Sequence, residues 1–278
     1  MIYNINRRKF IQLFSTSCCG LILPSCSTVP ITERKQLSII PEATINRQAS
    51  AAYEQFRTKT KLINSGKTLE TIKTIGRKIE NAVSAYFTNS NTKDPTSNFQ
   101  WDYILVDNDK VKNAWCMPGG KIAVYTGILK VTKNDNALAA VMGHEIAHAV
   151  ARHSVERASQ AATVNIGTQV ADIFLGGAIN RARSTVGRSS GVDIFALGIF
   201  NPFGRKQETE ADYLGLIFAS LAGFDIRESV HLWERMAESN KGKEPPQFLS
   251  THPSSKNRIK NLNKWITEVM VKYPPIKT

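Results

Sequence analysis

The chain has 278 residues, 42% of them hydrophobic, so it is long enough to bury one sizeable core and is not a miniature scaffold. It carries 36 basic and 23 acidic residues, a formal net charge of +13 that is spread along the chain and not gathered in one block. This charge favours anionic surfaces, but no nucleic-acid recognition motif accompanies it, so no specific nucleic-acid binding is expected.

Residues 1–25 are predicted to be a lipoprotein-type signal peptide. Residues 7–9 are basic, the stretch FIQLFSTSCCGLIL has the length of a signal core, and Leu23 stands three residues before Cys26 in LPSC. LPSC resembles a bacterial lipobox, although Pro24 is unusual there, which implies cleavage before Cys26 and lipid on its thiol. An uncleaved membrane anchor is the alternative, and either would hold the chain to a membrane from outside the cytoplasm.

Residues 26–40 are expected to form an extended polar tether, and residues 41–278 to form one domain. Two of the four cysteines leave with the signal and Cys26 would carry lipid, so Cys116 remains alone and no intramolecular disulfide is expected. No later segment reaches roughly eighteen consecutive apolar residues, so no further membrane span is predicted.

The first predicted helix covers residues 67–87, and a polar run at 88–98 follows it. The helix is indicated by apolar residues at steps of three and four, namely Leu69, Ile72, Ile75, Ile79 and Val83. Alternating apolar residues over 99–105 then predict a half-buried strand. In NAWCMPGGKIAVYTGIL, the residues Pro118, Gly119 and Gly120 predict a turn between two strands.

The next predicted helix covers residues 136–157 and carries the motif HEIAH at 144–148. Asn134 and Asp135 precede it, and both are typical N-cap residues. Residues 158–204 are mildly apolar and interrupted by glycines, so they are expected to be mobile helices and loops. We interpret this segment as a candidate gate over the cleft, or alternatively as an amphipathic surface that faces the membrane. Further helices are predicted over 205–221, 225–239 and 254–272.

His144 and His148 are four residues apart and therefore share one helix face, so both imidazoles can reach one ion. Glu145 stands beside them, where its carboxylate can take a proton from metal-bound water. Zinc suits imidazole and carboxylate ligands. Such a motif alone is not decisive, because the histidines could be ordinary core side chains. Ala151 and Ser154 occupy the positions where a metzincin has glycine and a third histidine, which excludes that class.

A third ligand is available about 60 residues later, where Glu208, Ala211, Asp212 and Gly215 share one helix face. Glu208 can complete a site of two histidines and one glutamate. Asp212, one turn further on, can accept a hydrogen bond from the free ring nitrogen of a ligand histidine and so orient it. Ala211 and Gly215 lack bulk, so this helix can approach the HEIAH helix closely.

Four motifs, HEIAH, ETEAD, NAWCMPGG and THPSSKNRI, together resemble the zinc metallopeptidases related to HtpX and the CAAX prenyl proteases, the gluzincins of metallopeptidase family forty-eight. The resemblance covers residues 40–270 and is strongest to the bacterial periplasmic lipoprotein branch. It implies a mainly helical α+β fold, a thermolysin-like zincin core with a small antiparallel sheet beside the HEIAH helix. It also implies one Zn²⁺ held by His144, His148 and Glu208, with Glu145 as general base.

The resemblance assigns further roles around the zinc. It implies that His252 either stabilises the oxyanion or caps the metal in a resting state, and that Arg258 and Asp212 surround the ligands. It also implies that a strand pairs with an extended substrate, although an ordinary covered edge is the alternative; the strand residues are Asn113, Ala114, Trp115 and Cys116. His153, rotated about 140° from His148 on a continuous helix, and the isolated His231 are expected to be structural.

The resemblance favours a zinc metalloendopeptidase that hydrolyses unfolded or misassembled envelope proteins, a quality-control protease of the bacterial periplasm. Ser27 after Cys26 gives no retention signal of the aspartate type, so a lipid anchor in the outer membrane is favoured. Polypeptide substrates and envelope assembly machinery are the expected partners. Two alternatives remain: a chaperone or adaptor lipoprotein that uses the same groove without turnover, and a structural lipoprotein that retains zinc for stability.

Overall fold

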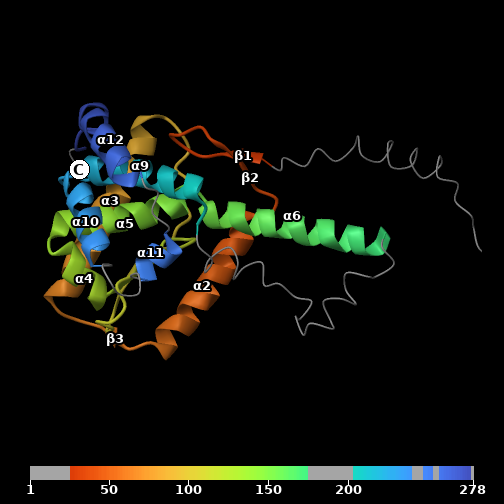
Figure 1. Cartoon of the computed structure of the whole chain (residues 1–278), viewed down its shortest axis with the longest axis horizontal. Coiled ribbons are helices and arrows are strands. Elements are labelled where there is room, and N and C mark those ends of the chain that lie inside the picture. The colour runs from red at the N-terminus through yellow and green to blue at the C-terminus, as the bar shows by residue number, and fades with distance from the viewer. Residues whose placement is uncertain (1–25, 175–202, 240–246, 253–256, 277–278) are drawn as a thin grey trace, which may run out of the picture.

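The structure is a computed structural model of the whole chain, and it describes residues 26–174, 203–239, 247–252 and 257–276 (Figure 1). At its centre lies α5 (Asp135–Val150), which contacts α9 (Arg205–Leu221), α3 (Lys67–Asn89), α10 (Glu228–Glu238) and strand β5 (Ala114–Met117). The mainly helical α+β fold with a small sheet beside the HEIAH helix is therefore confirmed. The predicted signal at 1–25 and residues 175–202 of the candidate gate lie outside the described residues.

Helices α5 and α9 approach each other more closely than ordinary side chains would allow. A Cβ added to Gly215 would lie 2.9 Å from the backbone nitrogen of His144, and one added to Gly143 would lie 2.9 Å from the carbonyl oxygen of Gly215. The close approach predicted from the small residues on α9 is thus confirmed. The predicted cap is confirmed as well, since the side chain of Asn134 accepts a hydrogen bond from the Ala137 N–H at 2.8 Å.

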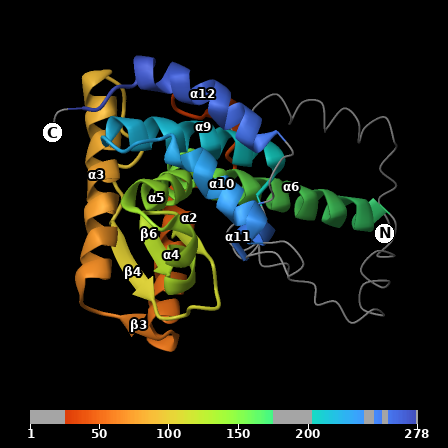
Figure 2. The ribbon, with the colours of Figure 1, turned by 60° about the vertical axis from the view of Figure 1, so that its left-hand side comes forward.

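The predicted helix 136–157 is two helices in the structure. Helix α5 ends at Val150, Arg152 adopts a left-handed conformation with φ of 57°, and α6 (His153–Phe174) begins directly after it. Helix α6 points away from the rest of the described chain, as Figures 1 and 2 show. The prediction of one continuous helix was wrong here, and the change of direction places His153 where a continuous helix would not.

The main sheet has four strands and lies beside α5. In sheet order the strands are β3 (Leu62–Ile63), β4 (Asp102–Val106), β6 (Lys121–Tyr125) and β5. The predicted turn between β5 and β6 is confirmed, with Gly119 at φ of 83° and Gly120 at φ of 82°. The sheet is mixed and not wholly antiparallel, because β4 and β6 run parallel with Asp102 opposite Lys121. The connection 107–113 carries the chain to the far edge, and β6 returns between β5 and β4.

Strand β4 is buried on both faces, whereas the sequence predicted a half-buried strand. Tyr103 and Leu105 pack into the main core with α3, while Ile104 and Val106 pack into a second cluster with Tyr53. Tyr53 belongs to α2 (Glu42–Lys59), a helix that the sequence analysis did not predict. Its buried residues form a narrow stripe at steps of four, namely Ile45, Ala49 and Tyr53.

The segment expected to be an extended tether contains a two-stranded hairpin. Strand β1 (Cys26–Thr28) pairs antiparallel with β2 (Lys35–Leu37), and polar side chains of the connecting turn reach α6 and α9. Helices α4 (Thr126–Thr132), α11 (Gln247–Thr251) and α12 (Arg258–Lys272) complete the described elements. Helix α12 begins at Arg258 in the described part of the chain, and residues 253–256, where the predicted helix over 254–272 begins, lie outside it.

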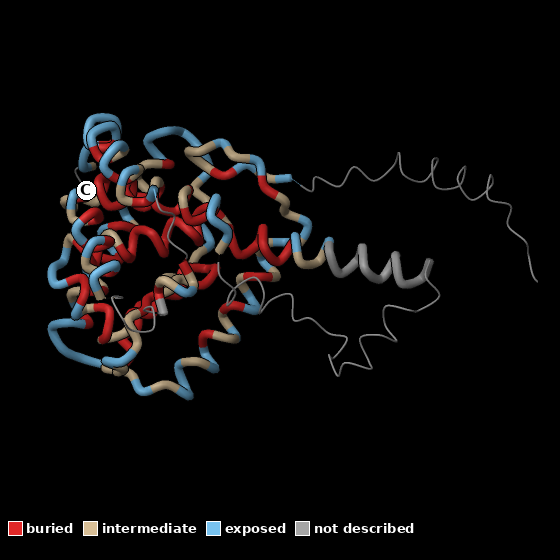
Figure 3. Tube along the Cα trace, in the orientation of Figure 1, coloured by how far each residue is buried: buried red, intermediate tan, exposed pale blue. Residues whose placement is uncertain are grey.

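Burial is concentrated where α5, α9 and the first turns of α6 meet (Figure 3). The core formed there contains polar residues as well as apolar ones: His144, Glu145, His148, His153, Glu208, Asp212, His252 and Arg258 are all buried. Buried charged groups are retained at a cost in free energy unless they are paired, so this cluster marks the candidate site. Among the described residues, no helix is both long enough and apolar enough to span a bilayer.

Candidate metal centre

Four side chains from separate parts of the sequence converge beside α5. His144 and His148 come from α5, Glu208 from α9 and His252 from the segment after α11, and each brings one ligand atom within 4.8 Å of the others. The two Nε2 atoms of His144 and His148 are 3.1 Å apart. The carboxylate of Glu208 lies 3.3 Å from Nε2 of His148 and 3.5 Å from Nε2 of His144. The three predicted zinc ligands are thus brought together.

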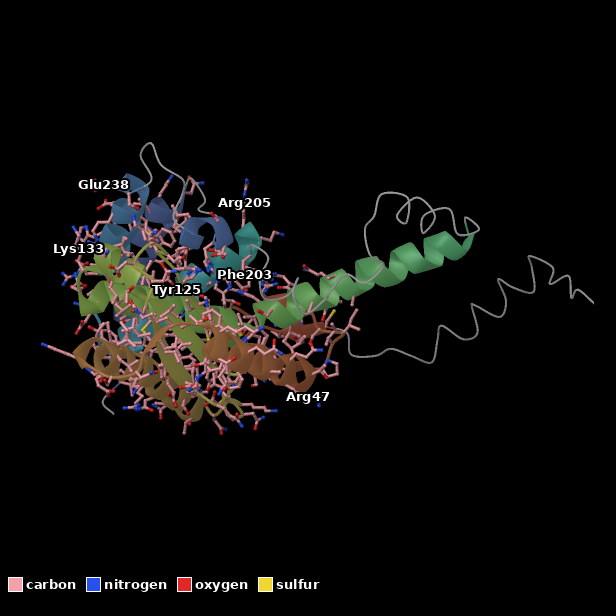
Figure 4. All side chains as sticks on the ribbon, turned by 90° about the horizontal axis from the view of Figure 1, so that it is seen from below. Arg47, Tyr125, Lys133, Phe203, Arg205 and Glu238 are labelled. Atoms are coloured by element: carbon pink, nitrogen blue, oxygen red, sulfur yellow. The ribbon has the colours of Figure 1, made fainter. Side chains whose placement is uncertain are left out.

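His252 is the fourth member of this cluster, and aromatic rings hold it in place. Its Nδ1 is 3.0 Å from Oε1 of Glu208 and 3.3 Å from Nε2 of His144. Phe248 and Phe203 stack on the imidazole at centroid distances of 4.6 and 5.5 Å. Phe203 also stacks on His148, at 3.8 Å, and lies between α9 and the start of α6 (Figure 4). Phe203 could not be identified from the sequence, because its role depends on this convergence.

The second ring nitrogen of each predicted histidine ligand has a polar neighbour. Nδ1 of His144 lies 3.0 Å from Oδ1 of Asp212, and Nδ1 of His148 lies 2.8 Å from Nδ1 of His153. When each Nδ1 carries its proton toward that neighbour, both Nε2 atoms present lone pairs to each other and to Glu208. In a buried site these lone pairs repel one another unless a cation lies between the two nitrogens and the carboxylate. Imidazole nitrogen and carboxylate oxygen are ligands that Zn²⁺ accepts, so the residues fit one zinc ion.

Arg258 balances the negative charge of the cluster. Its Nη2 donates to Oε2 of Glu208 at 2.6 Å and its Nε donates to Oδ2 of Asp212 at 2.6 Å, while the guanidinium lies over the ring of Trp233 at 3.8 Å. Asp212 and Arg258 therefore lie beside the ligands, where the resemblance placed them. Oε1 of Glu208 faces His148 and His252, while Oε2 accepts from Arg258 and also lies 3.5 Å from Nε2 of His144.

Burial and neighbouring charges shift the pKa values of Glu145, His148 and His144 in different directions. Burial raises the pKa of Glu145, which suits a carboxylate that must accept a proton near neutral pH. Burial lowers the pKa of His148 well below its ordinary value, so this imidazole is neutral, the form that binds metals. Burial also acts to lower the pKa of His144, but its contacts with Asp212 and Glu208 raise that pKa to about 10. A bound metal would have to displace that proton.

Glu145 faces a cleft and lies beside His252. One carboxylate oxygen, Oε1, is 3.3 Å from Nε2 of His252 and has no hydrogen-bond partner among the described residues. A buried carboxylate oxygen that accepts no hydrogen bond is costly and remains able to take up a proton. The geometry therefore allows Glu145 to act as a proton acceptor at the centre.

A cleft of about 340 Å³ opens in front of Glu145 and His252. All four residues of the predicted substrate strand line this cleft: Asn113, Ala114, Trp115 and Cys116. They lie at or next to β5, which is an edge strand of the sheet. Phe56 of α2 also lines the cleft and contacts Trp115 edge to face, with 5.1 Å between the ring centroids. Phe56 was not predicted to line the cleft, because the sequence pattern did not indicate α2.

Comparisons with known proteins agree with this geometry. The mitochondrial metalloendopeptidase OMA1 of Schizosaccharomyces pombe is 42% identical over 180 residues, which cover 63% of this chain and 50% of that protein. The OMA1 metalloendopeptidase of Homo sapiens is 29% identical over 288 residues, covering 96% of this chain and 52% of that protein. A putative beta-barrel assembly-enhancing protease of Vibrio cholerae is 28% identical over 173 residues, covering 61% and 34%. The chain therefore spans about half or less of the length of these relatives.

A model of peptidase family M48 matches residues 74–266, which is more than half of the chain. The matched range contains HEIAH, the Glu208 helix and the segment of His252, so the residues that converge in space all lie within it. The chain belongs to peptidase family M48, the family that the four sequence motifs indicated.

Proposed function

We propose that this chain is a zinc-dependent metalloendopeptidase that hydrolyses peptide bonds of extended or unfolded polypeptides. The convergence of His144, His148 and Glu208 directly beside the buried Glu145 carries the proposal. These three residues would hold Zn²⁺, with Asp212 orienting His144. When bound, the zinc would polarise a water molecule and the scissile carbonyl.

Glu145 acts as the general base in this proposal. Its raised pKa and its unpaired oxygen suit it to accept the proton of the attacking water and to deliver that proton to the leaving amine. A positioned carboxylate of this kind typically contributes roughly 10²- to 10⁴-fold to the rate.

His252 caps the centre in a resting state. Its Nδ1 lies within 3.3 Å of both Glu208 and His144, so this nitrogen lies among the ligands, while the ring also lines the cleft. This placement favours capping over oxyanion stabilisation, the two roles that the resemblance left open. The ring must move aside before a water can lie beside Glu145.

Substrates would bind as an additional strand along β5. An edge strand can pair with an extended peptide through backbone hydrogen bonds, which tolerate many sequences. The aromatic wall of Trp115 and Phe56 then favours a bulky apolar side chain near the scissile bond. Apolar side chains of this kind are exposed in unfolded proteins and buried in folded ones.

We further propose a cellular role, quality control of envelope proteins from a lipid anchor at Cys26. It is supported by the lipobox-like LPSC and by relatives named as a mitochondrial metalloendopeptidase and a beta-barrel assembly-enhancing protease. Attachment to the outer membrane and contact with envelope assembly machinery belong to the same proposal.

The test compares wild type with Glu145→Gln for zinc content and for cleavage of casein. We expect one zinc per chain in both proteins and a loss of cleavage of at least about 10²-fold in the variant. His231→Gln, a substitution at an exposed histidine that pairs only with Glu234 among the described residues, serves as the control. Equal cleavage by Glu145→Gln would refute the proposal, and protection of clients without cleavage by wild type would indicate the adaptor function.

A further inference from the structure

The two predicted histidine ligands are supported differently on the side away from the centre. His144 faces the carboxylate of Asp212 directly, at 3.0 Å. His148 instead faces a second imidazole, His153, whose Nδ1 is 2.8 Å from its own Nδ1. On its other side, Nε2 of His153 lies 2.9 Å from Oε2 of Glu210. His153 is fully buried, so these two neighbours account for both of its ring nitrogens.

The requirement that His148 binds a metal through Nε2 decides where the protons lie on His148 and His153. A metal-binding Nε2 on neutral His148 leaves its proton on Nδ1, which therefore donates to Nδ1 of His153. His153 must then carry its own proton on Nε2, and that proton is donated to the carboxylate of Glu210. With both imidazoles neutral and Glu210 ionised, only this placement of the protons gives every nitrogen a matching partner, and it exposes the lone pair of His148 to the centre.

Glu210, the end of this chain of groups, is fixed by residues of the N-terminal hairpin. Nε of Arg34 donates to Oε2 of Glu210 at 2.7 Å, and the hydroxyl of Thr32 donates to Oε1. The same guanidinium makes two hydrogen bonds to Glu156 of α6, at 2.8 and 2.9 Å. Gln207 of α9 donates to Glu156 at 2.7 Å. Arg34 thus joins α6 and α9 behind the metal centre.

We propose that His153 and Glu210 are positioning residues for the metal ligand His148, and that Thr32 and Arg34 of the hairpin hold Glu210 in place. These four residues are called the relay below. The inference rests on the proposed function, in which His148 binds zinc. It goes beyond the family match, because Thr32 and Arg34 lie outside the matched residues 74–266. The zinc affinity of the centre therefore depends on a segment that begins six residues after the proposed lipid site.

A purely structural role for the same residues has a different signature. A buried ion cluster that only joins α6 to α9 would stabilise the metal-free fold and would leave the affinity for zinc unchanged once the protein is folded. A positioning role changes the zinc affinity itself, because removal of a partner behind a ligand histidine typically weakens metal binding by roughly 10- to 100-fold. Zinc affinity and metal-free stability therefore separate the two roles.

The experiment measures the zinc dissociation constant of the full chain by competition with a chelator, together with the visible spectrum of the Co²⁺-substituted protein and the melting temperature without metal. His153→Phe removes both ring nitrogens and keeps an aromatic ring. His153→Asn keeps an acceptor oxygen near the position of Nδ1. Arg34→Met removes the guanidinium from the hairpin, far from the ligands in sequence.

Two matched controls make the same chemical changes at exposed positions. His231→Phe replaces a histidine that contacts Glu234, and Arg227→Met replaces an arginine whose bond to Asp225 is 2.7 Å long, as is the bond from Arg34 to Glu210. Both controls lie outside the relay, so their zinc affinity and Co²⁺ spectrum should equal those of wild type.

We expect His153→Phe to weaken zinc binding by roughly 10- to 100-fold and to shift the Co²⁺ spectrum, with a smaller loss in Arg34→Met and partial recovery in His153→Asn. Folded variants that bind zinc as wild type does would overturn the relay. If His153→Phe does not fold, Arg34→Met decides alone by the same criterion. Wild-type protein that holds no zinc would instead overturn the proposed function, so the two failures are distinguishable.

Discussion

Substitution of Gly215 by alanine tests whether the close crossing of α5 and α9 sets the metal centre. On helix propensity alone, alanine is better than glycine by about 1 kcal/mol, so the change would stabilise an isolated α9. In the folded chain, the new Cβ would lie 2.9 Å from the nitrogen and 3.0 Å from the Cα of His144. These are backbone atoms that cannot rotate away, so the helices must separate, and Glu208 must move with α9.

Overpacking of this kind costs about 1 to 3 kcal/mol, so the net loss after the gain in propensity is up to about 2 kcal/mol. A loss of 1 kcal/mol lowers the melting temperature of a domain of this size by about 2 to 4 °C. We therefore expect Gly215→Ala to lower the melting temperature without metal and also to weaken zinc binding, measured by chelator competition. Gly204→Ala is the control, because its Cβ would meet only an atom of Gln207 at 3.8 Å. A higher melting temperature with unchanged zinc affinity in Gly215→Ala would show that the close crossing of α5 and α9 does not set the metal centre.

Three further predictions concern side chains around the centre. Arg258→Met removes the guanidinium that pairs with the buried carboxylates of Glu208 and Asp212, so urea unfolding of the metal-free protein should show a loss of about 3 to 5 kcal/mol; an unchanged midpoint would contradict this. Burial raises the pKa of the Cys116 thiol, so iodoacetamide at pH 8 should alkylate it far more slowly in the folded chain than in urea, followed on its own peptide by mass spectrometry. Equal rates would show that the thiol is exposed. Trp115→Ala should raise KM for peptides with a bulky apolar residue next to the scissile bond more than for peptides with alanine there, and an equal effect on both would exclude the aromatic wall from specificity.

The helices around the centre were predictable because their burial follows a regular pattern. Apolar steps of three and four gave a helix over 67–87, and the structure has Lys67–Asn89. The polar face ETEAD gave a helix over 205–221, which is Arg205–Leu221 in the structure. The N-cap at Asn134 was predictable because its cause is local: an asparagine before an apolar helix accepts a hydrogen bond from a free backbone N–H of the first turn.

The elements that the sequence did not reveal depend on long-range packing. Helix α2 buries only a narrow stripe of three residues, too weak a pattern to indicate a helix. Arg152 gives no local sign of its left-handed backbone, so the break between α5 and α6 was missed. The mixed sheet arises because β6 inserts between β4 and β5, an order that periodicity does not encode.

The same distinction applies to the site. His144, His148 and Glu208 could be predicted as a group because spacing and motif resemblance both point to them. The position of His153 could not, because on a continuous helix it would lie about 140° away from His148. Arg34 is separated from Glu210 by 176 residues, and only the fold brings them together. The predicted gate over 158–204 stays a prediction, as does the lipid on Cys26.

The most direct test of the central claim is the zinc coordination of the purified chain, determined by X-ray absorption or by anomalous scattering from a crystal. We predict one zinc bound by Nε2 of His144, Nε2 of His148 and a carboxylate oxygen of Glu208, each at about 2.0 to 2.2 Å. A zinc ion bound without Glu208, or held by histidines outside this cluster, would contradict the proposed metal centre.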